Sequence, residues 1–189
     1  MRLFTGKGDT GMTDLLGARV SKDDARIDLL GSFDEATSTI GLARAQATAE
    51  RTGALLVIVQ RDLYQIMAEL AYTDNLRPAS QQFRGERVDW LENETDTLTT
   101  DVPLPPHFVL PGDSVAGAAL DVARTVVRRV EREAVALHHQ GQVTNPEILR
   151  YLNRLSSLLF IAARFEDREA GVTPMPAKEE KGKHPSRGA

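Results

Sequence analysis

Apolar residues recur every three or four positions through most of this chain, and this spacing constrains the fold more than any other feature. The clearest repeat runs in steps of four and three residues from Leu55 to Leu70. Such a period places one stripe of side chains on the buried face of an α-helix. Because no stretch alternates strands with helices, we predict an all-α fold, in which 189 residues with 41% hydrophobic content bury one core.

The predicted architecture is a ferritin-like, up-and-down bundle of four long helices and a shorter fifth. The predicted helices cover residues 23–47, 54–73, 87–98, 114–137 and 145–168. Gly53 introduces the second helix, and Asp74 and Asn75 end it. Asn145 is a good N-cap and Pro146 a good first-turn residue, so together they predict the start of the last helix.

The two ends of the chain have a different composition from the predicted bundle, residues 21–168. Glycines at positions 6, 8, 11 and 17 predict that residues 1–20 form a loop outside the core. Residues 169–189 are rich in proline, glycine and charge and poor in apolar residues. We therefore expect a flexible C-terminal tail.

Composition excludes several classes of function. The chain has no cysteine, which rules out disulfides, thiolate metal sites and cysteine nucleophiles. A net charge of −4 argues against nucleic acid as a partner, and no run approaches the roughly 18 apolar residues of a membrane span. We expect a cytoplasmic protein. The Glu-x-x-His pattern of di-iron bundles is absent, and we interpret His138 and His139 as a solvated helix end, so no transition-metal site is predicted.

The segment from Thr5 to Thr13, TGKGDTGMT, has the composition of a phosphate-binding loop. Glycines let backbone N–H groups approach an anion, and Lys7 adds positive charge. It is not a Walker loop, because Gly-x-x-x-x-Gly-Lys-Ser/Thr is absent. A flexible arm without a ligand is the alternative.

Three arginines, Arg124, Arg128 and Arg132, recur at four-residue steps and share one stripe of the fourth predicted helix. Arginine pairs well with carboxylate and phosphate, so this stripe suits a triphosphate. The alternative is a solvated face with internal pairs such as Arg128–Glu131 and Arg129–Glu133.

Two polar residues interrupt predicted apolar stripes. Asp34 lies among Ile27, Leu30 and Gly41, and a buried carboxylate there requires a cationic partner. Asn153 interrupts the apolar side of the last helix. It is either a satisfied core amide or a functional group.

Five ordered blocks between residues 3 and 165 resemble the PduO-type ATP:cob(I)alamin adenosyltransferase family. The blocks are TGKGDTGMT, SKDDARIDLLGSFDEATSTIGLARA, FVLPGD, VARTVVRRVER and NPEILRYLNRLSSLLFIAAR. The resemblance implies transfer of the 5′-deoxyadenosyl group of ATP to cob(I)alamin, with release of triphosphate. It also implies a homotrimer with active sites between subunits, a possible reductase and a possible adenosylcobalamin-dependent enzyme as partners. A noncatalytic cobalamin or nucleotide carrier of the same fold and a purely structural helical oligomer are the alternatives.

The same resemblance implies roles for individual residues. The residues that would hold ATP are Thr5, Gly6, Lys7, Gly8, Thr13, Asp14, Lys22, Arg128, Arg129, Val130, Glu131, Arg132 and Asn153. Mg²⁺ would accompany ATP, with Glu131 as its possible protein ligand. Asp34 and Arg124 would pair across the subunit interface and contribute to catalysis and cobalamin binding together with Phe108, which would cover the lower face of the corrin. Arg128 would also be catalytic, because cob(I)alamin is itself the nucleophile and the protein supplies positioning and electrostatics.

At five positions the sequence departs from the pattern that it resembles. Lys7 and Thr10 stand where Thr and Lys are usual, which shifts the positive charge of the loop. Asp113 replaces the second glycine of L-P-G-G, Asp121 a frequent His, and Ser157 the usual Asp after N-R-L-S. These changes bear mainly on the corrin contacts.

Overall fold

The computed structural model describes residues 4–73, 76–102 and 104–178 and is mostly helical. Its elements in chain order are β1 (Met12–Leu15), β2 (Ala18–Ser21), α1 (Ala25–Gln46), α2 (Glu50–Ala71), the 3₁₀ turn η2 (Ala79–Gln81), α3 (Glu86–Asp101), α4 (Val115–His139) and α5 (Pro146–Glu169). The predicted bundle of four long helices and a shorter one, α3, is confirmed.

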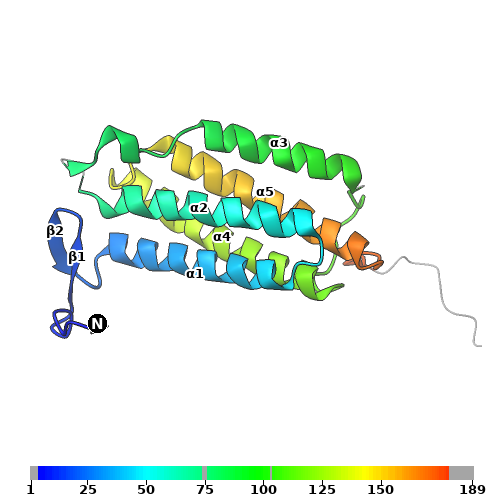
Figure 1. The fold of residues 1–189 in the computed structure, drawn as a ribbon, viewed down its shortest axis with the longest axis horizontal. Coiled ribbons are helices and arrows are strands. Elements are labelled where there is room, and N and C mark those ends of the chain that lie inside the picture. Colours follow the sequence, from blue (N-terminus) through cyan, green and yellow to red (C-terminus); the bar gives the residue numbers. More distant parts are fainter. Residues whose placement is uncertain (1–3, 74–75, 103, 179–189) are drawn as a thin grey trace, which may run out of the picture.

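Helix α4 packs against α1 and against α5, and it lies behind α1 and α2 in the view of Figure 1. Helix α2 packs on α1, and α3 packs on α5. Leu29, Phe33 and Ile40 of α1 and Leu120 and Val127 of α4 are fully or almost fully buried between the helices. None of the helices in the described part of the chain is long and apolar enough to cross a membrane.

Local capping explains where most helices begin. Ser114 accepts a hydrogen bond from the backbone N–H of Gly117 at 2.9 Å, and Asn145 accepts one from that of Glu147 at 3.0 Å. Both predicted helix starts are confirmed. The predicted start of α2 at Gly53 is wrong, because the helix begins at Glu50 and includes this glycine. Asp74 and Asn75, the predicted end of α2, lie outside the described residues.

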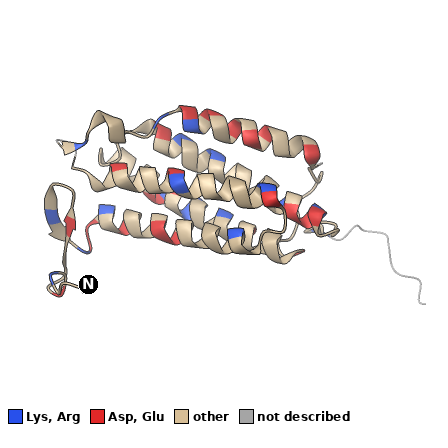
Figure 2. Cartoon of the chain, in the orientation of Figure 1, with Lys and Arg blue, Asp and Glu red and all other residues tan. Residues whose placement is uncertain are grey.

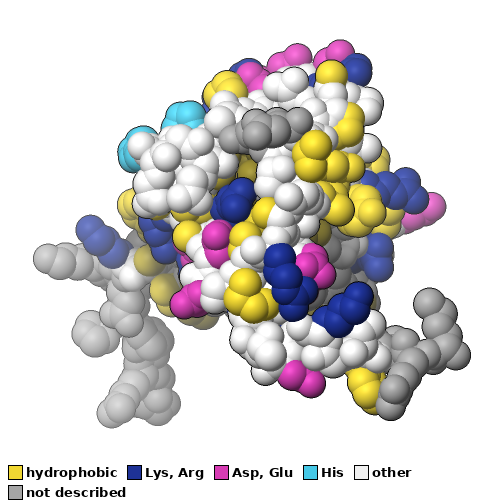
Figure 3. All heavy atoms as spheres, turned by 90° about the vertical axis from the view of Figure 1, so that its left-hand side faces the viewer, with side chains coloured by type: hydrophobic (Ala, Val, Ile, Leu, Met, Phe, Trp, Pro, Cys, Tyr) yellow, Lys and Arg dark blue, Asp and Glu magenta, His cyan; other side chains and the backbone are white. Residues whose placement is uncertain are grey.

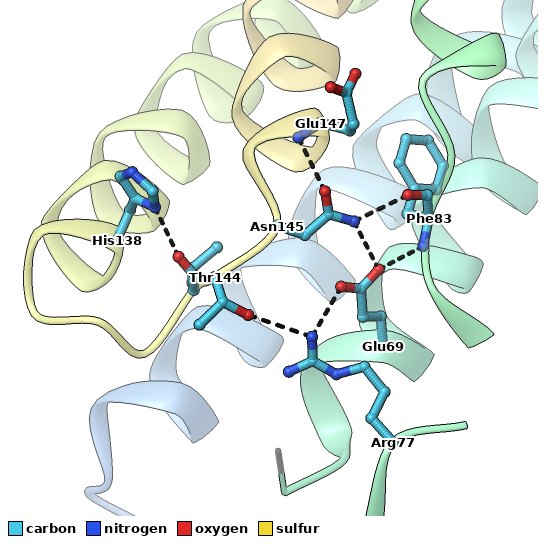
Figure 4. Close-up of polar contacts among 8 residues, drawn as sticks. Glu69, Arg77, Phe83, His138, Thr144, Asn145 and Glu147 are labelled. Carbon is cyan, nitrogen blue, oxygen red and sulfur yellow. Dashed lines mark hydrogen bonds and ion pairs between the residues drawn. The ribbon is translucent and has the colours of Figure 1, made fainter. Parts of the chain in front are cut away.

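A buried polar cluster around Glu69 fixes the start of α5 (Figure 4). The Glu69 carboxylate is 1% exposed and accepts hydrogen bonds from the Asn145 amide at 3.1 Å and from the Phe83 backbone N–H. Arg77 donates to its other oxygen at 3.2 Å. Because Asn145 also caps α5, this cluster ties α2, the segment before α3 and α5 together at one end of the bundle.

The predicted N-terminal loop is wrong for its second half, which forms a hairpin. Strands β1 and β2 pair antiparallel from Met12 with Ser21 to Leu15 with Ala18. Gly17 makes the turn possible with a φ of 111°. The hairpin projects from the end of the bundle where α1 begins (Figure 1), and Leu16 attaches it to α2 by donating to the Ala71 carbonyl at 2.8 Å.

The predicted flexible tail is also wrong for the residues that follow α5. Ala177 donates a backbone hydrogen bond to Phe108 at 2.7 Å, and Leu110 donates one to Met175 at 2.8 Å. The Asp113 carboxylate accepts from the Met175 N–H at 3.1 Å. Residues 175–177 therefore form a strap along the segment before α4. Backbone pairing of this kind requires no apolar pattern, so composition gave no sign of it. Residues 179–189 of the predicted tail lie outside the described residues.

Candidate functional site

The most chemically suggestive hollow lies between α4 and α5 and has a volume of about 290 Å³. Its lining is Arg128, Glu131, Arg132, Val135 and Asn153. The Asn153 amide donates to the Glu131 carboxylate at 2.8 Å, which joins the two helices. Within the part of the chain that the structure describes, Arg128 and Arg132 have no ion-pair partner. The hollow therefore presents two available guanidinium groups beside one carboxylate.

A second hollow of about 320 Å³ adjoins the first and shares Arg128 with it. Its lining is Thr95, Thr99, Leu104, Arg124, Arg128, Ser156, Ser157, Phe160 and Ile161. No acidic side chain is among these described lining residues, and one of the five sequence departures, Ser157, is there. The two hollows together form one basic surface, which we call the α4–α5 face. Acidic residues lie along α3 instead (Figure 2).

The solvated-face alternative accounts for Arg129 but not for Arg128 or Arg132. Arg129 forms an ion pair with Glu35 of α1, and Glu133 is 3.9 Å from its Nε. The hydrogen bond that Arg129 donates to the Glu35 carboxylate is the main reason why the pKa of Arg129 is raised. The predicted Arg128–Glu131 pair is not seen among the described contacts, because Glu131 binds Asn153.

Two of the predicted ATP-binding side chains point away from the α4–α5 face. Arg129 reaches α1, and Val130 is fully buried in the core. Asn153 is exposed rather than a core amide, because the apolar stripe of α5 lies beside it on Leu152 and Leu155.

The N-terminal loop, residues 4–11, lies against the hairpin, so that several residues predicted to bind ATP are close together there. Gly6 and Gly11 have φ values of 72° and 78°. Lys7 is exposed, and its carbonyl accepts a hydrogen bond from Arg19 at 2.6 Å. A Cβ atom on Gly8 would come 3.2 Å from the Lys22 ammonium, so this glycine allows Lys22 to approach the loop.

Sequence reasoning missed Arg19, which also bonds Asp14 at 2.8 Å. These two residues are cross-strand partners in the hairpin, so recognising the hairpin would have identified the pair. Thr13 is half-buried on β1, and Thr5 accepts from the Lys7 N–H at 3.4 Å. Lys and Arg side chains stand out on this end of the molecule (Figure 3). Among the described residues, the lining of the two hollows includes none from this loop.

Asp34 and Arg124 do not meet within one chain. The expectation that Asp34 is buried is wrong for the single chain, because the other stripe of α1, with Phe33 and Ala36, faces the core. The Arg124 Nε donates instead to Asp121, three residues earlier, at 3.0 Å.

Phe108 lies on the segment before α4 and is 88% exposed. Its backbone carbonyl is held by the strap, so the segment is fixed while the ring faces solvent. Nearby in sequence, Gly112, Asp113 and Val115 line a separate hollow of about 480 Å³ together with α1. An exposed aromatic ring on a fixed segment is suited to covering another flat apolar surface.

Within the described residues, no three His, Cys, Asp or Glu side chains are grouped so as to hold a metal ion. Glu131 is the one carboxylate lining the first hollow. A hard cation such as Mg²⁺ takes oxygen ligands and usually keeps water and phosphate among them. Glu131 fits that chemistry only if a phosphate-bearing ligand completes the coordination.

Comparisons with known proteins identify the family of this chain. The family model described as cobalamin adenosyltransferase matches residues 3–166. A corrinoid adenosyltransferase of Bacillus subtilis is 37% identical over 176 residues, covering 91% of this chain and 90% of that protein. The corrinoid adenosyltransferase PduO of Citrobacter freundii is 38% identical over 90% of this chain, which spans 51% of that longer protein. A solved phenylalanine-to-alanine variant of the PduO-type ATP:corrinoid adenosyltransferase of Lactobacillus reuteri, complexed with cobalamin and ATP, superposes with a TM-score of 0.87. It is 30% identical, over 94% of this chain and 100% of that one.

Proposed function

The chain belongs to the cobalamin adenosyltransferase family and is a corrinoid adenosyltransferase, and we propose that its α4–α5 face holds ATP during the reaction. The reaction transfers the 5′-deoxyadenosyl group of ATP to cob(I)alamin and releases triphosphate. The observation that carries the proposal is the first hollow, where Arg128 and Arg132 stand without ion-pair partners among the described residues, beside the linked Glu131 and Asn153.

In this proposal the protein acts by charge and position. Cob(I)alamin attacks the ribose C5′ as a nucleophile, so no general base or covalent residue is required. Arg128 and Arg132 stabilise the negative charge that develops on the leaving triphosphate. Glu131 would hold the Mg²⁺ that accompanies ATP, and this ion would neutralise further charge on the phosphates. Asn153 orients Glu131 through its hydrogen bond.

The N-terminal loop would complete the ATP site of a neighbouring subunit. This arrangement is supported by the position of the loop, which extends from the hairpin away from the bundle (Figure 1), and no described residue of the loop lines the hollows of its own chain. Asp34 is exposed, and Leu42, Val115 and Val122 of α1 and α4 are 55%, 72% and 52% exposed. A homotrimer in which Asp34 of one chain meets Arg124 of the next would cover such residues.

Asp34→Ala should weaken the trimer, because Arg124 would lose the partner proposed for it across the interface. Light scattering over a range of protein concentrations measures this change. Asp96→Ala is the matched control, since Asp96 is an exposed carboxylate on α3, away from α1 and α4. A wild-type monomer at micromolar concentration would refute the trimer.

For the corrin, we propose that Phe108 covers the lower face and keeps the lower ligand away from cobalt. An apolar, four-coordinate setting makes cobalt(II) easier to reduce to cobalt(I). The exposed ring on a held backbone supports this role. The protein would have two cytoplasmic partners. One is a reductase that supplies the electron, and the other is an enzyme that receives adenosylcobalamin.

One assay tests the function directly. Purified protein is given ATP, Mg²⁺ and chemically reduced cobalamin, and the absorption spectrum is followed for the cobalt–carbon product. Catalytic formation of the product, with one triphosphate released per turnover, is expected. Binding of both substrates without turnover would identify a noncatalytic carrier instead.

A further inference from the structure

We propose that Asp121 is a positioning residue for Arg124, held in place by a buried network at the junction of α4 and α5. This inference rests on the proposed function, because it assumes that Arg124 acts in the active site. Asp121 is 4% exposed, although it lies on a helix whose other acidic residues are more accessible. Its role cannot therefore be that of a solvated surface charge.

The two oxygens of Asp121 face in different directions. One accepts the Nε–H of Arg124 at 3.0 Å, and the other accepts an N–H of Arg164 at 2.9 Å. Arg164 is 1% exposed and its guanidinium also lies 2.9 Å from Asp167, which is fully buried. Asp121 thus connects a buried arginine of α5 to the arginine that lines the second hollow.

The charges of this network require Arg124. Asp121, Arg164 and Asp167 together carry a net charge of −1 in the interior, and an uncompensated buried charge is strongly destabilising. Arg124 brings the sum to zero while its own side chain remains 25% exposed. The attraction holds the guanidinium by Nε and leaves its two terminal nitrogens for the hollow that it shares with Arg128.

Close packing keeps the network from moving. Asp167 accepts a hydrogen bond from the hydroxyl of Ser114, the N-cap of α4, at 2.6 Å. A Cβ atom on Gly117 would lie 2.2 Å from an Asp167 oxygen, so only glycine lets the first turn of α4 come so near. Phe160, whose ring centre is 5.5 Å from the Arg164 guanidinium, lines the hollow itself. The helix cap, the buried pair and the hollow are therefore one connected structure.

The main test compares Asp121→Asn with Asp62→Asn. Asp62 is a matched control, because it is 5% exposed and accepts two hydrogen bonds from Arg87, yet it lies on α2 away from the hollows. Both changes should lower the melting temperature. Asp121→Asn alone should also reduce kcat, by about tenfold to hundredfold for a weakened charge-assisted hydrogen bond, with little change in the KM for ATP. Equal kcat values in the two folded variants would overturn the proposal.

A double-mutant cycle shows whether the effect passes through Arg124. In an Arg124→Ala background, Asp121→Asn should cause no additional loss of kcat. Additive losses would mean that Asp121 acts on the reaction by another route, and would overturn the proposal.

If Asp121→Asn does not fold, Arg124→Lys serves in its place. Lysine keeps the positive charge that neutralises the network but has no Nε–H to donate to Asp121. The melting temperature should therefore stay near that of the wild type while kcat falls. An unchanged kcat would count against the positioning role of Asp121.

A measurement that needs no activity separates this inference from the proposed function. The ¹⁵Nε–¹H resonance of Arg124 should exchange slowly with water in the wild type and rapidly in Asp121→Asn, but not in Asp62→Asn. If the wild type shows this protection and yet forms no adenosylcobalamin, the geometry stands and the proposed function fails. Rapid exchange in the wild type refutes the positioning role whatever the activity.

Discussion

The α4–α5 face and the N-terminal loop are proposed to hold the same ATP molecule from two different subunits, yet they are built in opposite ways. Arg128 and Arg132 project from a helix that is packed between α1 and α5. Lys7 lies on an exposed loop, and the Lys7 carbonyl accepts a hydrogen bond from Arg19 of the hairpin. A rigid helix fixes where the phosphate charge is stabilised, whereas a loop can adjust to a ligand that is already bound.

Phe108→Ala tests whether a residue outside the helices can matter more than one on the α4–α5 face. Loss of the ring should allow the lower ligand to return to cobalt, so activity that starts from cobalt(II) should fall by about 100-fold or more. For each ~59 mV by which the cobalt(II)/cobalt(I) potential drops, the equilibrium constant for forming cobalt(I) falls tenfold. Pre-reduced cobalt(I), which binds no lower ligand, should show a smaller loss. Parallel assays with the two forms measure the difference, and equal losses would make Phe108 a packing residue.

Arg128→Ala tests the rigid half of the ATP site. Removing a charge-assisted contact costs about 1.5–3 kcal/mol, so kcat/KM for ATP should fall about tenfold to hundredfold. Arg61→Ala is the control, because Arg61 is also exposed on a helix, α2, but lines neither hollow. Unchanged kinetics at all ATP concentrations would return Arg128 to the solvated-face alternative.

Sequence alone predicted the helices better than the segments between them. Periodicity located all five helices, and the N-caps Ser114 and Asn145 were visible because capping uses a local side chain. The hairpin escaped because its turn, Leu16–Gly17, lacks the usual Asn-Gly or Asp-Gly signature. The strap escaped because it is held mainly through backbone groups.

Spacing along one helix predicted the arginines of the candidate site, but not the contacts that join them to other helices. Arg128 and Arg132 are four residues apart, so they share a face whatever surrounds them. The Glu131–Asn153 bond and the Asp121–Arg164 pair join different helices, and the order of residues in one helix does not reveal its partner in another. Asp34 was misplaced for a related reason, since α1 has two stripes and only packing decides which faces the core.

Gly117→Ala tests whether the rigidity of the α4–α5 face depends on the close contact between the two helices. A Cβ atom at this position would overlap Asp167, and such overpacking costs about 1–3 kcal/mol in the free energy of unfolding. Gly53→Ala is the control, because a Cβ there meets nothing within 4 Å. This control should stabilise α2 by up to about 1 kcal/mol. Denaturant titration measures both, and equal stabilities would mean that the junction adapts to the added methyl group.

Lys7→Ala should have the smallest effect, and it tests the adjustable half of the ATP site. A single exposed charge contributes about 0.2–1 kcal/mol, which corresponds to no more than about a fivefold rise in the KM for ATP. The effect should shrink further as salt is added, because exposed charges are screened. Since a loop of this kind acts through several backbone N–H groups as well as through one ammonium, kcat should remain close to that of the wild type. Steady-state kinetics at two salt concentrations measure both parameters. A salt-independent loss as large as that of Arg128→Ala would show that the loop closes on the phosphates as a desolvated, rigid element, and the distinction between the two halves of the site would then disappear.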